Sequence, residues 1–365
     1  MSEKKGKKLS KYWKIVLILA IITLIINILA RIRPVCDFYV NNIFRIITTP
    51  YMWFTGLFKF SLGSVFLLLG LIIIIVAIIL AILLIFLKNS KFKKFSVIYF
   101  KSMLVIILIT GLLMSLNCSA LYRCSRIDNN EEYTLQDLKD VYNILIEKCN
   151  ECAVKIDRYG NGEVYYDKDM DELIHKAVKK MSETNRRYRG YTPDAKPFLF
   201  KKTWYQANLL GQYFPFSMEA NYSDYMNDIT KAPTICHELS HLKGYIYEDE
   251  ANYIAFLTCV ESGDEFLEYA GYVFALSYIE VEYLSIVKKP APDDKKLNPL
   301  TREYDFITYK MSKKDELKKL DESAGKKVVN AVSNKIEETY MNYYDSTPNY
   351  DEVTRLILQY YKGSK

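Results

Sequence analysis

Three residues in the middle of the chain have the types and the spacing of a catalytic zinc site. His237, Glu238 and His241 form the motif His-Glu-x-x-His. On a helix, positions four apart share one face, so both imidazoles can bind one tetrahedral metal ion while Glu238 faces a metal-bound water. The sequence holds only 3 histidines in 365 residues, so two of them at this spacing around an acid are poorly explained by chance.

A third ligand is expected from the acidic run that follows the motif. Gly244 can end the first helix one turn after His241, and a second helix can begin near Glu248. Helical spacing gives this second helix a small, weakly polar face that suits packing against the first helix. That face consists of Glu248, Asn252, Ala255 and Cys259. It favours Glu248 as the ligand, with Glu250 and then Asp249 as alternatives, although acids at a helix start also favour its dipole without any metal.

This ligand set predicts the chemistry of peptide hydrolysis. Two neutral imidazoles and one carboxylate would leave one Zn²⁺ per chain with a fourth position for water, whose pKa the metal lowers. Glu238 would act as the general base, taking the proton of the water and passing it to the leaving amine. Asn252 would accept a hydrogen bond from a ligand imidazole or position Glu248. The remaining histidine, His175, lies in a lysine-rich stretch and is expected at the surface.

The N-terminal third of the chain is apolar enough to cross a membrane several times. Three segments qualify as transmembrane helices, at about residues 13–30, 65–87 and 98–116. The intervening segment from Tyr39 to Phe60 is interrupted by Arg45, Pro50 and Lys59 and carries aromatic residues suited to the headgroup zone. We therefore expect this segment to lie at the membrane interface.

Lysines beside the apolar segments indicate the orientation. Lysines are concentrated before the first segment and again in the loop from Lys88 to Lys94, which predicts that both lie in the cytoplasm. Three crossings then place the rest of the chain outside the plasma membrane, whereas a fourth crossing at residues 39–60 would return it to the cytoplasm. Because so much positive charge lies beside the spans, the net charge of +6 indicates topology and gives no support for a nucleic-acid partner.

The chain thus divides into a membrane anchor, residues 1–117, and an outer domain, residues 118–365, which is large enough for its own core. Helical periodicity predicts helices at Leu135 to Ile156, Met170 to Met181, Thr234 to about Val287, and Lys313 to Tyr344. The stretch from Gly211 to Tyr222 predicts an extended edge segment that is interrupted by Pro215. Its part from Gly211 to Asn221 could pair with a peptide or could equally be an ordinary strand or hairpin. The expected fold class is mainly α with a small β-sheet.

The cysteines fit an outer location. Six of the 7 lie in the predicted outer domain, at positions 118, 124, 149, 152, 236 and 259. An even number in an oxidising compartment permits up to three disulfides. Cys149 and Cys152 form a CxxC motif without a second one, which favours a local disulfide or buried thiols over a redox or zinc-knuckle role.

The chain resembles a family of bacterial multi-pass membrane proteins of unknown function that have a zincin-like domain. The resemblance rests on Pro233 to His241 (PTICHELSH), Glu248 to Ala255 (EDEANYIA), the upstream Gln212 to Asn221 (QYFPFSMEAN) and the three-span layout. More distantly, HExxH followed by Glu-x-x-Ala-Asp is similar to the membrane metallopeptidases that include CAAX prenyl proteases and HtpX-like enzymes. That similarity implies a gluzincin-type fold with Glu248 as the third zinc ligand. Asn252 stands where those enzymes have Asp.

Two classes of function fit these residues. One is a membrane-anchored zinc metallopeptidase that acts on a peptide or protein substrate, including a membrane-associated one. The other is a non-catalytic zinc-binding membrane sensor or assembly protein that retains the zincin fold. Glu238 favours the enzyme, because a structural zinc site has no use for a base there. An intramembrane protease is disfavoured because polar and charged residues surround this HExxH motif.

Overall fold

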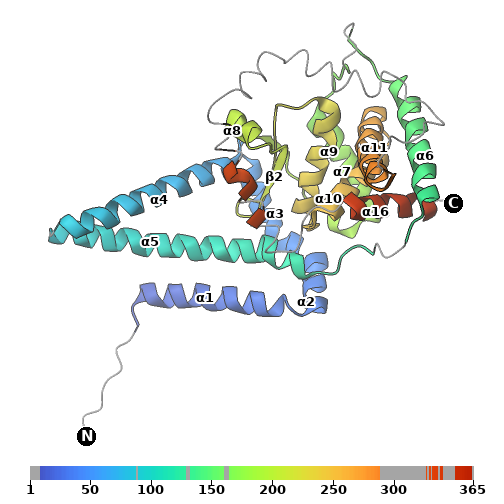
Figure 1. The fold of residues 1–365 in the computed structure, drawn as a ribbon. Helices are drawn as coiled ribbons and strands as arrows, with labels where there is room; N and C mark the ends of the chain where they lie inside the picture. The colour runs from blue at the N-terminus through green and yellow to red at the C-terminus, as the bar shows by residue number, and fades with distance from the viewer. Residues whose placement is uncertain are drawn as a thin grey trace.

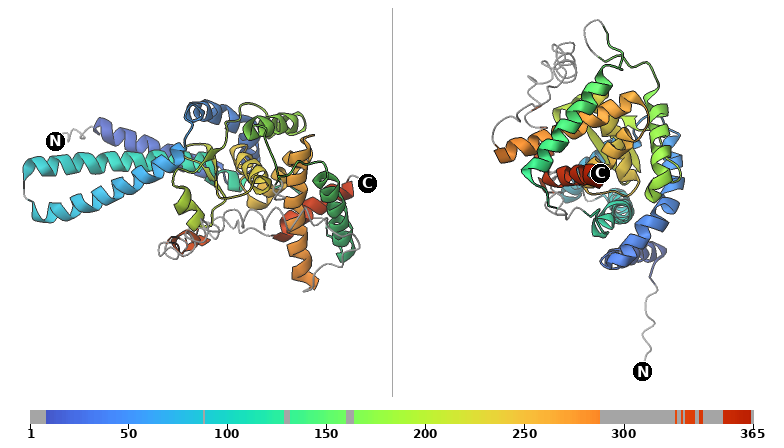
Figure 2. Two further views of the ribbon diagram at one scale, coloured as in Figure 1. Left: turned by 90° about the horizontal axis from the view of Figure 1, so that it is seen from above. Right: turned by 90° about the vertical axis from the view of Figure 1, so that its right-hand side faces the viewer.

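Helices dominate the computed structural model, which describes residues 9–87, 89–128, 132–159, 164–287 and 350–363 with a few positions between 326 and 339. Among these residues, three short strands form one small sheet. Three long helices project side by side from a globular part that contains the sheet (Figure 1, Figure 2). The fold class is therefore mainly α with a small sheet, as the sequence indicates.

The three projecting helices are α1 (Lys11–Leu29), α4 (Leu62–Phe86) and α5 (Ser90–Met114), and each overlaps a predicted span. Helix α5 begins before the predicted residue 98, within the lysine-rich stretch that was predicted to be a loop. All three are long and apolar enough to cross a membrane. They begin at Ser10, Ser61 and Asn89, whose side chains accept hydrogen bonds from backbone amides of the first turn. The start of α1 and the connection between α4 and α5 both lie toward the end that is remote from the globular part (Figure 1).

A fourth helix, α11 (Glu265–Val287), also has the length and composition of a span, but it lies in the globular part (Figure 1). It packs against α6 (Leu135–Ala153), α9 (Asp228–Leu242), α10 (Glu248–Val260) and α16 (Tyr350–Gly363). Its buried residues include Leu267, Tyr269, Ala275 and Ile279. The apolar character of α11 therefore serves the protein core.

The predicted helices correspond to the observed ones with two differences. Residues 135–156 and 170–181 correspond to α6 and to α7 (Met170–Thr184), and the CxxC cysteines of α6 are buried thiols. The break between α9 and α10 was predicted at Gly244, whereas the break between α10 and α11 was not, and α9 starts earlier than expected, at Asp228. The helix predicted from Lys313 to Tyr344 lies largely outside the described residues.

The segment between the first two long helices folds onto the globular part. It comprises α2 (Arg33–Phe38), the π-helical turn η1 (Tyr39–Ile43) and α3 (Phe44–Gly56). Val40, Phe44 and Met52 lie in the same core as the residues of α9 and α10. The opposite face of α3 exposes Ile46, Ile47, Trp53, Phe54 and Leu57, a composition that suits a membrane interface. Part of the predicted anchor thus contributes to the core around α9.

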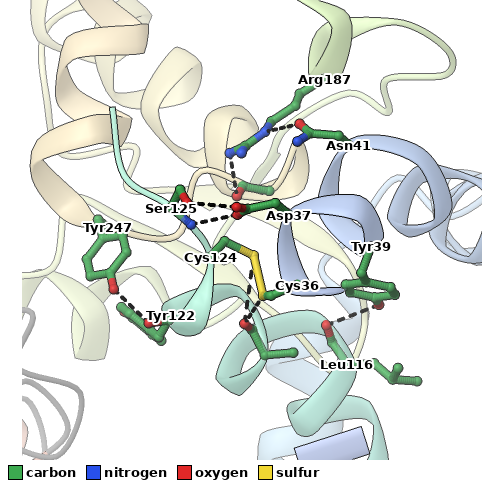
Figure 3. Close-up of a disulfide and its surroundings, with 12 residues drawn as sticks. Cys36, Asp37, Tyr39, Asn41, Leu116, Tyr122, Cys124, Ser125, Arg187 and Tyr247 are labelled. Atoms are coloured by element: carbon green, nitrogen blue, oxygen red, sulfur yellow. Dashed lines mark hydrogen bonds between the residues drawn. A yellow bond between two sulfur atoms is a disulfide. The ribbon is translucent and has the colours of Figure 1, made fainter. Parts of the chain in front are cut away.

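A disulfide fixes this segment to the chain that follows α5 (Figure 3). It joins Cys36 of α2 to Cys124, which directly follows the short helices η2 (Ser115–Ser119) and η3 (Leu121–Arg123). Beside it, the carboxylate of Asp37 accepts hydrogen bonds of 2.7 Å from the amide and from the hydroxyl of Ser125. Disulfides were predicted only among the six cysteines at positions 118, 124, 149, 152, 236 and 259. Cys36 became a partner because its segment folds back onto the outer domain.

The sheet consists of β1 (Lys196–Pro197), β2 (Gly211–Phe214) and β3 (Glu219–Tyr222) in the order β1-β3-β2, with β1 parallel and β2 antiparallel to β3. The predicted extended segment is therefore a hairpin, and Pro215 lies in its turn because proline cannot donate to a strand ladder. Met218 takes a φ of 51° in the same turn. Among the described strands β2 has one neighbour and is an edge strand, whereas β3, which lies in the same predicted segment, is the central strand. The short segments η4 (Arg186–Tyr188) and α8 (Lys201–Gln206) flank β1 in sequence.

Candidate metal centre

Helix α9 carries the His-Glu-x-x-His motif and ends where the sequence predicts. Its N-terminal cap is Asn227, whose side chain accepts a backbone hydrogen bond in the first turn. At the other end Gly244 has a φ of 92°, and its amide donates to the carbonyl of His241 at 3.0 Å. The amide of Tyr245 donates to the carbonyl of Ser240 at 3.1 Å. This pair of bonds is a Schellman motif, which turns the chain back beneath His241.

Helix α10 packs against α9 through the face that its spacing predicts. Ala255 and Cys259 are fully buried, and the sulfur of Cys259 lies 3.8 Å from that of Cys236 in α9. At the start of the same face, Glu248 and Asn252 reach the two histidines of α9. The predicted face of α10 is therefore confirmed.

Three side chains converge on one point between the two helices. The Nε2 atom of His237 lies 3.1 Å from Nε2 of His241 and 3.1 Å from Oε2 of Glu248. The Nε2 atom of His241 lies 3.7 Å from Oε1 of Glu248. All three ligand atoms lie within 4.8 Å of one another. This arrangement can hold a metal ion with two nitrogen ligands and one oxygen ligand.

The second nitrogen of each imidazole already has a partner. Nδ1 of His237 lies 2.8 Å from Oδ1 of Asn252, as expected for a residue that supports a ligand, and Nδ1 of His241 lies 2.7 Å from the carbonyl oxygen of Tyr245. Both partners are acceptors, so each Nδ1 donates its hydrogen. A neutral imidazole in this tautomer has its lone pair on Nε2. If both imidazoles were neutral, their two lone pairs would face the carboxylate of Glu248. The site therefore favours a cation between these groups, which can be a proton on Nε2 of His237 or a metal ion.

The charges of these groups depend on burial and on one another. Burial lowers the pKa of His241 to about 4, which keeps it neutral at pH 7 as a metal ligand must be. Burial also opposes charging of His237, but the hydrogen bond and the charge of Glu248 outweigh it and raise its pKa to about 9. For Glu248 burial acts to raise the pKa, whereas the two histidines act against it and lower it to about 2.

The two alternative ligands have other partners. The Oε1 atom of Glu250 accepts a hydrogen bond of 2.7 Å from the amide of Ile127, and burial raises the pKa of this carboxyl to about 7. Asp249 forms an ion pair with Arg126. Of the three acids at the start of α10, Glu248 is therefore the one that lies with the histidines.

Glu238 is buried beside this group and lies under strand β2. Burial raises its pKa to about 8, and the backbone amide of Tyr213 is a hydrogen-bond partner that acts in the opposite direction. Its Oε2 atom is buried and has no hydrogen-bond partner among the described residues. Gly211 approaches the carboxyl so closely that a Cβ atom at this position would lie 2.8 Å from Cδ of Glu238.

The free edge of β2 faces the same place. In an antiparallel pair, positions that bond to the neighbouring strand alternate with positions that do not. The amide of Ser223 donates to the carbonyl of Leu210 at 2.7 Å, so Gly211 and Tyr213 are positions whose backbone groups point away from β3. The backbone contact between Tyr213 and Glu238 agrees with this alternation. The edge strand therefore presents backbone donors and acceptors next to the buried carboxyl.

His175 lies apart from the cluster, as expected. Its Nε2 atom is 2.7 Å from Oδ1 of the exposed Asp194, and its own side chain is more than one-third exposed. The hydroxyl of Tyr213 points away from the site, because it donates to the carbonyl of Asn117 at 2.9 Å. This phenol is therefore not available as an additional donor beside the histidines.

Sequence reasoning missed two contributors to the site. The first is Gly211, although an isolated glycine in a strand pattern is a known signal of close backbone approach. The second is the carbonyl of Tyr245, which no residue type could reveal because a main-chain atom makes the contact. Its position follows from the turn at Gly244, which the sequence does indicate.

Comparison with known proteins places the chain in a family. Residues 39–358 match the sequence model of a family described as protein of unknown function (DUF3810), which covers most of the chain. The chain belongs to this family. The matched region of this DUF3810 protein includes His237, His241 and Glu248, and it also includes helix α3. No curated protein and no solved structure gave a match. None of these comparisons supports the resemblance to membrane metallopeptidases, which stays a prediction from the motifs of this DUF3810 chain.

Proposed function

We propose that the chain is a membrane-anchored zinc metallopeptidase that binds one Zn²⁺ through His237, His241 and Glu248. The observation that carries this proposal is the convergence of two Nε2 atoms and one carboxylate within 4.8 Å of one another. Both imidazoles are fixed in the ligand tautomer by acceptors at Nδ1. Three protein ligands are the usual number in catalytic zinc sites, because the fourth position takes water or substrate.

Glu238 is the proposed general base. A zinc ion held by these ligands would supply Lewis acidity, which acidifies water and polarises a peptide carbonyl. Glu238 directly follows the ligand His237 in the sequence. Its Oε2 atom has no hydrogen-bond partner among the described residues, so it could accept a proton from water. Burial raises the pKa of Glu238 to about 8 without a metal ion, and a bound cation would lower it toward the range of a group that takes up a proton and then returns it. It would pass that proton to the leaving amine.

The substrate would be an extended segment of a peptide or protein. Strand β2 offers the backbone amide and carbonyl of Gly211 at its free edge, and an added strand could pair with them. The absence of a side chain at this position leaves the carboxyl of Glu238 directly beneath such a strand. The gluzincin-type fold that the motifs imply is part of the same proposal.

The proposed topology has the N-terminus in the cytoplasm and the globular part outside the plasma membrane. The lysine-rich starts of α1 and α5 both lie toward the end of the long helices that is remote from the globular part (Figure 1). The disulfide between Cys36 and Cys124 belongs to the opposite end and suits an oxidising compartment. The bilayer is the second partner in this proposal, and nothing in the charge distribution favours a nucleic acid.

The test compares the full chain with its Glu238→Gln variant in detergent. Fluorescent peptide libraries would be incubated with both proteins, and the zinc content of each would be measured. We expect hydrolysis by the wild type, loss of at least a hundredfold in the variant, and equal zinc in both. Equal zinc with no hydrolysis by either protein would favour the alternative, a non-catalytic zinc-binding sensor or assembly protein. The full chain is needed because residues from α2 and α3 lie in the core.

A further inference from the structure

A buried ion pair joins the sheet to the beginning of a long helix. Nζ of Lys196 in β1 lies 2.5 Å from Oε1 of Glu219 in β3, and the two side chains are 5% and 2% exposed. The carboxylate also accepts hydrogen bonds from the amides of Leu62 at 3.1 Å and Gly63 at 2.6 Å, the first two residues of α4. Glu219 thus lies at the N-terminus of α4, which has the highest mean hydropathy of the candidate spans among the described residues.

Neighbouring elements supply further hydrogen-bond partners to both members of this ion pair. Lys196 donates a further hydrogen bond of 2.7 Å to the carbonyl of Thr55, near the end of α3. A carboxylate at a helix N-terminus interacts favourably with the helix dipole and with the unpaired amides. Removal of either partner would leave the other charge buried without compensation, which is strongly destabilising. The end of α3, the start of α4 and the sheet are therefore held together at one point.

Strand β2 connects that point to the candidate catalytic carboxyl. Phe214, at one end of β2, pairs in register with Glu219 and packs so tightly on Gly63 that a Cβ at residue 63 would lie 2.6 Å from its Cγ. Gly211, at the other end, lies against Glu238. The four-residue strand spans only about 10 Å between these contacts. One short strand thus touches the start of α4 and the proposed base.

The end of α5 holds the same hairpin. The side-chain amide of Asn117, in η2, donates to the carbonyl of Pro215 in the hairpin turn at 2.8 Å. The carbonyl of Asn117 accepts from the hydroxyl of Tyr213 in β2 at 2.9 Å. All these partners are buried. The start of α4 and the turn η2 that continues α5 therefore both form hydrogen bonds with the hairpin.

We propose that Glu219 is a positioning residue, which fixes the edge strand β2 relative to Glu238 by anchoring the hairpin to the start of α4. In consequence the disposition of α4 in the membrane sets the peptide-binding edge of the site. This inference rests on the proposed function, because it assigns the edge strand a substrate. It concerns the strand and leaves the metal ligands unchanged.

The test separates binding at the metal from binding at the strand. Acetohydroxamate can chelate zinc but is too small to pair with β2, whereas a peptidyl hydroxamate chelates zinc and also pairs with the strand. The Lys196→Met, Glu219→Gln double variant removes the ion pair without leaving a buried charge alone. In detergent-solubilised full chain, we expect peptidyl hydroxamate to bind roughly 10- to 100-fold more weakly to this variant, with zinc content and acetohydroxamate affinity unchanged.

A second variant and a control keep the test decisive. Phe214→Ala loosens β2 from Gly63 without touching any charge, and the same selective loss is expected. The control is Glu172→Gln with Lys176→Met, which removes an exposed ion pair on α7 and should alter neither affinity. Unchanged peptidyl affinity in both test variants, or a parallel loss of both ligands, overturns the positioning role alone. Failure of the wild type to bind either hydroxamate overturns the proposed function and this inference together.

Discussion

Gly211 of the edge strand lies directly against the carboxyl of Glu238, with no room for a side chain between them. A Cβ atom at residue 211 would lie 2.8 Å from both Cγ and Cδ of Glu238, closer than real Cβ contacts. The strand and the helix that carries the proposed base are therefore in contact through a glycine backbone. Any change at residue 211 must displace one of them.

Replacement of Gly211 with Ala should consequently impair hydrolysis while sparing the metal site. The added methyl group displaces the Glu238 carboxyl or β2, and a shift of about 1 Å at a catalytic group can lower a rate about a hundredfold. The measurement is the rate of peptide cleavage together with zinc content. Gly111→Ala in α5 is the matched control, because a Cβ there meets nothing within 4 Å. Full activity in Gly211→Ala would refute the assigned position of Glu238.

The turn after α9 gives a second prediction, about stability. Gly244 and Gly190 both have a φ of 92°, but a Cβ at residue 244 would lie 2.6 Å from Cγ2 of Val40 and one at residue 190 would meet nothing within 4 Å. Gly190→Ala should cost about 1–2 kcal/mol from the backbone alone. Gly244→Ala should cost about 1–3 kcal/mol more through overpacking.

Thermal or denaturant unfolding of both variants in detergent measures this difference. Val40→Ala provides the rescue, since it removes the obstructing methyl groups and should restore part of the loss in Gly244→Ala but none in Gly190→Ala. Equal destabilisation by the two glycine replacements would mean that Val40 does not pack against the turn.

The disulfide between Cys36 and Cys124 gives a prediction about both stability and compartment. Unreduced peptide mapping of protein from membranes should find these two cysteines linked, while Cys152 and Cys236 are recovered as thiols after unfolding. Cys36→Ser with Cys124→Ser should lower the free energy of unfolding by about 2–5 kcal/mol. Recovery of Cys36 and Cys124 as thiols would contradict the outward orientation of the globular part.

Local sequence signals predicted the helices of the site and their faces well. The spacing of His237 and His241, the helix end at Gly244 and the face led by Glu248 follow from helical geometry, and the structure has each of them. Glu248 lies beside the histidines and Glu250 does not, because the two side chains point to different faces of one helix, while the role of Glu248 as a ligand stays a prediction. The three long apolar helices could also be predicted from the sequence, because their length and composition define them.

Contacts between segments that are distant in the sequence could not be predicted in the same way. Val40 lies in the stretch from Tyr39 to Phe60, whose apolar and aromatic composition indicates a membrane interface, and Cys36 lies just before it. One face of that stretch nevertheless lies in the core that contains residues of α9 and α10. Composition cannot distinguish apolar residues that meet lipid from those that meet a protein core. The ion pair of Lys196 and Glu219 was missed because its two members are ordinary charged residues until the hairpin brings them to the start of α4.

The most direct test of the central claim is elemental analysis of the purified full-length chain for zinc. We expect about one zinc per chain in the wild type and in Glu250→Gln, because the wild-type carboxylate of Glu250 accepts from the amide of Ile127 and is not a proposed ligand. His237→Ala and Glu248→Gln should each lose the metal while remaining folded. A well-folded wild type without zinc, or full zinc retained after both ligand replacements, would contradict the proposed site.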